Sequence, residues 1–78
     1  MAVPRLYSFR EIAVVLNSFG FYEVGSTPRS HVKFWNTDER SVLVPRRNRE
    51  LPVGTFRSEL RIAGLICKQF DERAGEVL

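Results

Sequence analysis

The sequence has little of the residue types on which metal and disulfide chemistry depend. Among 78 residues, Cys67 is the only cysteine and His31 the only histidine. A single cysteine excludes an intrachain disulfide and is typical of proteins from reducing compartments. One cysteine and one histidine are also too few for a structural zinc site, so we expect neither a metal ion nor another cofactor.

Long hydrophobic runs are absent as well. No stretch approaches the roughly 18 consecutive apolar residues that a membrane-spanning helix needs. Near the N-terminus, Arg5, Arg10 and Glu11 interrupt any signal-like run, so we expect a cytoplasmic protein. The length predicts one domain over residues 1–78 with a thin core, and an apolar content of 44% argues against disorder.

Acidic residues are outnumbered, with nine Asp and Glu against twelve Lys and Arg and a net charge of +3. Most of these cations are arginines, whose planar guanidinium can donate two parallel hydrogen bonds to a phosphate. Composition alone fits an anionic partner and an ordinary basic surface equally well.

Three segments have the apolar spacing of amphipathic helices. The expected bounds are residues 8–18, 55–63 and, for a short third helix, 67–73. Ser8 and Glu11 have the spacing of a capping box at the start of the first helix, and Gly20 has the position of a C-terminal cap. Thr55 is expected to be the N-cap of the second helix.

Three strand-forming segments lie between the first two helices, at residues 21–25, 30–36 and 41–45. Short turns between them predict a three-stranded antiparallel sheet in an α+β fold of α-β-β-β-α order. Both helices need an apolar surface, so both are expected on one sheet face. Alternation places Val32 and Phe34 under the helices. His31, Lys33 and Trp35 then lie on the open face.

His31 on an open face suits RNA cleavage. An imidazole with a pKa of about 6.5 takes and gives protons at cellular pH. In RNA the ribose 2′-OH attacks the adjacent phosphate once a base removes its proton, and nearby cations stabilise the transition state without a metal. A second acid–base group, which the sequence does not identify, is also required. A surface histidine without a role is the competing interpretation.

Residues near His31 are candidates for binding the RNA chain, namely Arg29, Ser30, Lys33, Trp35, Arg46 and Arg47. The cations suit phosphates, and Trp35 suits base stacking. A cross-strand pairing role for Trp35 stays open, as does a solvated or protein-docking role for the basic loop. The start of the second helix, residues 55–59, holds one cation, and Glu59 is expected to repel phosphate, which argues against a duplex and in favour of single-stranded RNA.

Five motifs occur in order along the chain: NSFGF (17–21), SHVKF (30–34), VLVP (42–45), ELPVGTFRS (50–58) and LRIAGL (60–65). Over about residues 9–70 they resemble the HicA (YcfA-like) mRNA interferase toxins of HicAB toxin–antitoxin systems. The resemblance implies a double-stranded-RNA-binding-like fold and a metal-independent endoribonuclease with His31 as the catalytic residue. It also implies that mRNA is the substrate and that a HicB-like antitoxin covers the His31 site in a prokaryotic cytoplasm.

Arg29 departs from the family pattern, because the position before Ser-His usually holds glycine. A glycine allows close approach of a substrate or partner to the backbone. Two alternatives therefore stay open: a single-stranded RNA-binding module that does not cut, and an inactive homologue that only binds a partner.

Overall fold

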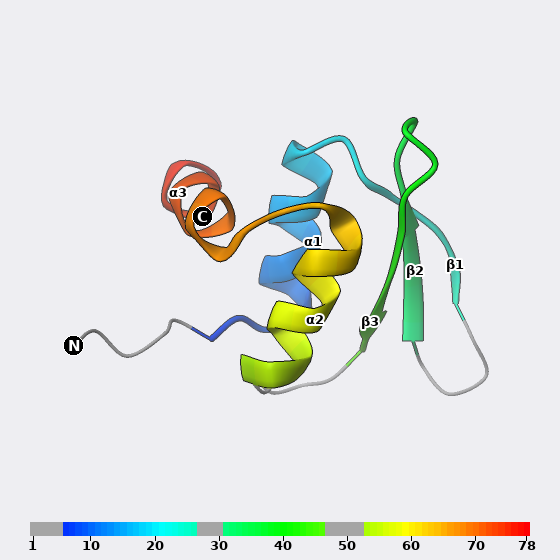
Figure 1. Cartoon of the computed structure of the whole chain (residues 1–78), viewed down its shortest axis with the longest axis horizontal. Coiled ribbons are helices and arrows are strands. Elements are labelled where there is room, and N and C mark those ends of the chain that lie inside the picture. Colours follow the sequence, from blue (N-terminus) through cyan, green and yellow to red (C-terminus); the bar gives the residue numbers. More distant parts are fainter. Residues whose placement is uncertain (1–5, 27–30, 47–52) are drawn as a thin grey trace.

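The computed structural model describes residues 6–26, 31–46 and 53–78. Its elements are α1 (Phe9–Ser18), β1 (Tyr22–Ser26), β2 (His31–Trp35), β3 (Ser41–Pro45), α2 (Val53–Ala63) and α3 (Cys67–Val77) (Figure 1). This order and the antiparallel sheet confirm the predicted α+β fold. None of the helices in the described ranges is long and apolar enough to cross a membrane.

Helix α1 begins and ends as the sequence predicts. Ser8 is its N-cap, and the capping box is complete because Ser8 and Glu11 each accept a hydrogen bond from the other's backbone N–H. At the other end Gly20 has a φ of 87°, the left-handed conformation that glycine adopts most readily. The next N–H, of Phe21, donates to Leu16 at 3.0 Å and closes the helix.

Helix α2 begins at Val53, so the prediction that Thr55 is its N-cap is wrong. Tertiary packing, rather than local helix propensity, determines where α2 begins. Phe56 and Leu60 are buried one turn apart against the sheet and α3, and this packing outweighs the weak helix propensities of valine and glycine at its start. Helix α3 continues four residues past the predicted end at 73, because the fully buried Ala74 extends its apolar face.

The sheet has the strand order β1-β2-β3, with both pairs antiparallel and β2 in the centre. Strand β1 starts one residue later than predicted and carries a bulge between Glu23 and Gly25. Residue 30, predicted to open the second strand, lies outside the described residues, whereas β3 has the predicted bounds. Val32 and Phe34 of β2 are buried, which confirms the predicted alternation.

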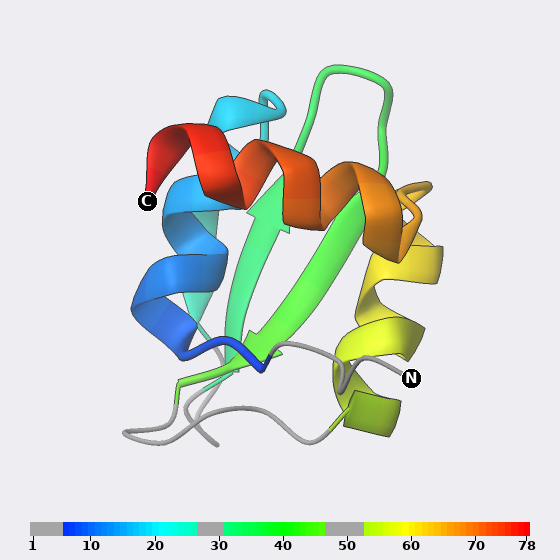
Figure 2. The ribbon, with the colours of Figure 1, turned by 90° about the vertical axis from the view of Figure 1, so that its left-hand side faces the viewer.

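All three helices lie on one side of the sheet (Figure 1). Helices α1 and α2 pack against it, and α3 crosses over both on the side away from the strands (Figure 2). Phe70 of α3 is fully buried there, with its ring centre 4.9 Å from that of Tyr7 and 5.0 Å from that of Phe56. The helices therefore cover one sheet face and leave the other without a helix.

Candidate functional site

The strand register defines which residues share the uncovered sheet face, called the open face below. Its cross-strand rows are Tyr22–Trp35–Ser41, Gly25–Lys33–Leu43 and His31–Pro45. Glu23 pairs with the buried Phe34 and so belongs to the other face. Among the paired strand positions, the open face thus holds Lys33 and His31 but no carboxylate, and it is suited to an anionic ligand.

His31 is the first residue of β2 and lies on the open face, as alternation predicted. It is partly exposed and does not belong to the hydrophobic core, whereas the next residue, Val32, is fully buried. Its cross-strand neighbour is Pro45, at the end of β3. The single imidazole of the chain therefore stands where a ligand on the open face can reach it.

Glu59 of α2 lies against β3, and its carboxylate accepts a hydrogen bond from the backbone N–H of Leu43. Oε2 of Glu59 is buried and has no hydrogen-bond partner among the described residues. Burial raises the pKa of Glu59, while the Leu43 N–H and the charge of His31 lower it. Glu59 is therefore an electrostatic neighbour of His31.

The structure corrects the interpretation of Glu59 as an exposed charge, because this side chain is half-buried between α2 and β3. A carboxylate in this position does not stand out on the surface to repel a duplex, whereas residues 55–59 still hold only one cation, Arg57. The spacing carried a signal for this burial: residue 59 lies three after Phe56 and four before Ala63, at the border of the apolar stripe of α2.

Lys33 and Trp35 follow His31 along the open face. Lys33 is exposed, and Trp35 is half-buried beside Tyr22 of β1, with ring centres 6.4 Å apart and planes inclined by 50°. The cross-strand pairing that stayed open for Trp35 is therefore present. Tyr22, which is 48% exposed, could not be assigned to a face from the sequence, because the bulge in β1 interrupts the alternation along this strand.

Arg46 lies on the other side of the sheet from His31. Its Nη2 is 3.5 Å from Oε1 of Glu23, and its guanidinium carbon is 5.3 Å from the centre of the Phe9 ring of α1. The structure therefore does not bring Arg46 to the open face. The other predicted RNA contacts, Arg29, Ser30 and Arg47, lie outside the described residues.

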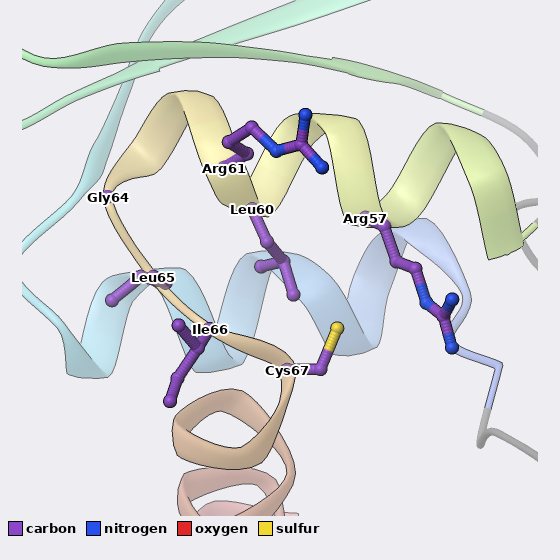
Figure 3. Close-up of a pocket in the computed structure, with 7 residues that line it drawn as sticks. All are labelled: Arg57, Leu60, Arg61, Gly64, Leu65, Ile66 and Cys67. Carbon is purple, nitrogen blue, oxygen red and sulfur yellow. The ribbon is translucent and has the colours of Figure 1, made fainter.

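A separate hollow of about 410 Å³ lies between α2 and the start of α3 (Figure 3). Its lining residues are Arg57, Leu60, Arg61, Gly64, Leu65, Ile66 and Cys67. It belongs to the helical layers and contains none of the residues of the open face. The described part of the chain also holds no group of three side chains suited to bind a metal ion.

One comparison with known proteins identifies a family. The family model for the HicA toxin of bacterial toxin–antitoxin systems matches residues 9–65. This span starts with α1 and includes the whole sheet and α2, whereas α3 lies beyond it. A search of curated proteins finds no significant match.

Proposed function

The chain belongs to the HicA toxin family. From this membership we infer that its toxicity comes from cleavage of messenger RNA, with His31 as the catalytic residue. As a HicA toxin it is the toxin of a toxin–antitoxin pair, and its partner is an antitoxin. The proposed activity is that of a metal-independent endoribonuclease acting on single-stranded mRNA. The observation that carries the proposal is His31 on the open face, two residues from Lys33 and with no carboxylate at the paired strand positions around it.

In the proposed reaction, the ribose 2′-OH is the nucleophile. A base removes its proton, the 2′-oxygen forms a bond to phosphorus, and the bond from phosphorus to the 5′-oxygen breaks. The leaving 5′-oxygen takes up a proton from an acid, so the products are a 2′,3′-cyclic phosphate and a 5′-hydroxyl. His31 exchanges one of these protons, since an imidazole is an effective acid and base near neutral pH.

Lys33 supports this step through its charge. Its side chain is exposed on the same strand face as His31, so its ammonium can approach the phosphate on which negative charge accumulates. Trp35, on the same face, is proposed to contact the RNA as well. Arg29, Ser30 and Arg47 remain predicted contacts from segments that adjoin β2 and β3. Arg46 would have to leave Glu23 and Phe9 to bind a phosphate.

The antitoxin is proposed to be HicB-like and to inhibit by covering the open face. This position would separate His31 from RNA without any change in the toxin fold. Binding of the antitoxin and binding of RNA are then mutually exclusive, so a competition between the two follows directly from the shared surface.

The proposal is tested by expressing the chain with and without its antitoxin and by incubating the purified protein with single-stranded RNA in EDTA. We expect growth arrest only without the antitoxin, and cleavage that persists in EDTA. Inhibition by EDTA would indicate a metal enzyme instead. RNA that is bound and never cut would identify a non-catalytic RNA-binding module. Binding of an antitoxin alone would identify an inactive homologue and implicate Arg29.

A further inference from the structure

Two aromatic side chains lie side by side on the open face at the end away from His31. Tyr22 and Trp35 are directly opposite each other on β1 and β2, and their ring centres are 6.4 Å apart. The core of the protein contains four fully buried large aromatic rings, yet 48% of Tyr22 is exposed and Trp35 is partly exposed. A surface pair of this kind presents aromatic area to a ligand.

The surroundings of this pair indicate the ligand. Ser41 continues its row on β3, and Lys33 occupies the next row. No carboxylate stands at the paired strand positions of this face, and Lys33 supplies a cation there that can attract an anion. The ligand that fits is a single-stranded nucleic acid: an unpaired base can stack on the aromatic rings, and the attached phosphates can approach the ammonium group of Lys33.

We propose that Tyr22 and Trp35 form a stacking site for one unpaired base of the RNA, apart from the phosphodiester on which His31 acts. The inference rests on the proposed function in taking RNA as the ligand. The inclined planes, at 50° to each other, exclude a parallel sandwich around a base. The base instead stacks on the exposed ring surface of one residue and meets the other at its edge.

The spacing along β2 separates this site from the reacting bond. Trp35 is four residues after His31, which corresponds to about 13 Å along a strand. The base and phosphate of a single nucleotide do not span this distance. The stacked base therefore belongs to a nucleotide at least one position removed from the cut, and Lys33, midway between the two, lies beside the intervening phosphate. Because any base can stack, we expect the site to hold the RNA strand in position without selecting a particular sequence.

Trp35 is the only tryptophan of the chain, so its fluorescence reports on this site alone. The probe is a short 2′-O-methyl oligoribonucleotide, which binds as RNA does but lacks the 2′-OH nucleophile and is not cut. We expect this probe to quench Trp35 in the wild-type protein. The same probe with every base removed keeps its phosphates and should lose the quenching.

Variants of Tyr22 make the test quantitative, because they leave the reporter in place. Tyr22→Ala should weaken binding by about 5- to 150-fold, the range measured for loss of one stacking partner, and Tyr22→Phe should bind nearly as well as the wild type. Ile62→Ala is the matched control, since Ile62 is an equally exposed apolar residue on α2, away from the open face. Circular dichroism verifies that each variant is folded.

The outcomes separate this inference from the proposed function. Quenching by a bound probe, in a protein that never cuts RNA, would support the stacking site and reject the ribonuclease. Cleavage of RNA together with unquenched Trp35 and unchanged binding by Tyr22→Ala would reject the stacking site alone. If the antitoxin changes the Trp35 fluorescence and the probe does not, the aromatic pair belongs to a protein interface and the inference fails.

Discussion

Arg73 of α3 donates a hydrogen bond from Nη1 to the backbone oxygen of Ser18, the last residue of α1, over 2.7 Å. The same guanidinium lies 4.4 Å from the centre of the Phe19 ring. The last carbonyl groups of a helix have no partner within the helix, and a cation is favoured near them by the helix dipole. The Arg73 side chain therefore links α3 to the end of α1 through a hydrogen bond and a contact between cation and ring.

Replacing Arg73 by alanine should destabilise the fold by about 1–3 kcal/mol, because it removes a charged hydrogen bond and a contact between cation and ring. Urea unfolding followed by circular dichroism measures this loss. Arg61→Ala is the control, since Arg61 is exposed on α2, and it should stay within about 0.5 kcal/mol of the wild type. Equal losses in both variants would show that Arg73 contributes only as a surface charge.

Glu59 makes stability depend on pH in a defined direction. Burial raises its pKa in the folded state, so between the ordinary value and the raised one the folded chain holds a proton that the unfolded chain has released. Stability therefore falls as pH rises through this window. Glu59→Gln has no such titration and should gain stability relative to the wild type as pH rises from about 4 to about 7.

The measurement is a set of urea unfolding curves across this pH range for the wild type, Glu59→Gln and Ile62→Ala. Ile62→Ala changes no titratable group, so its difference from the wild type should stay constant. A difference between Glu59→Gln and the wild type that is equally independent of pH would contradict the assignment of Glu59 as a buried carboxylate beside Leu43.

Lys33 and Arg46 should differ in how they affect the salt dependence of RNA binding. Lys33 is exposed on the open face, whereas Arg46 contacts Glu23 and Phe9 on the other side of the sheet. Each phosphate contact to a single strand contributes about 0.7 to the slope of log affinity against log salt. Lys33→Ala should reduce the slope by about this amount and Arg46→Ala by much less. A larger reduction by Arg46→Ala than by Lys33→Ala would indicate that RNA binds on the helix-covered side of the sheet, which contradicts the proposal.

The parts of the fold that follow local rules could be predicted from the sequence. Ser8 and Glu11 indicated the start of α1 through capping, and Gly20 indicated its end through a left-handed turn. The face of His31 followed from alternation, because a strand that is regular and half-buried has only one arrangement in which Val32 and Phe34 are covered.

The parts that depend on packing between distant segments could not be predicted in the same way. From the sequence alone Glu59 is expected to be a surface charge, because its burial depends on the packing of α2 against β3. The partnership of Tyr22 with Trp35 requires the register across a bulge, which local pattern does not specify. The start of α2 at Val53 reflects tertiary packing that outweighs helix propensity.

The nucleophile of the proposed reaction is tested by replacing one 2′-OH of an RNA substrate with hydrogen. At the nucleotide whose 3′-phosphate is cleaved, this replacement removes the attacking group, so cleavage there should cease while binding is retained. Electrophoresis of end-labelled fragments measures both the loss and the cyclic phosphate ends of the unmodified substrate. Cleavage that continues at an unchanged rate would mean that water is the nucleophile.

The central claim concerns His31, and the rate of RNA cleavage by His31→Ala compared with the wild type tests it most directly. General acid–base groups contribute about 100- to 10,000-fold, so we expect a rate reduced by at least about 100-fold, in a protein whose circular dichroism is unchanged. His31→Gln, which keeps a polar side chain but exchanges no proton near neutral pH, should be equally slow. A folded His31→Ala protein that cuts RNA within a few-fold of the wild-type rate would contradict the account.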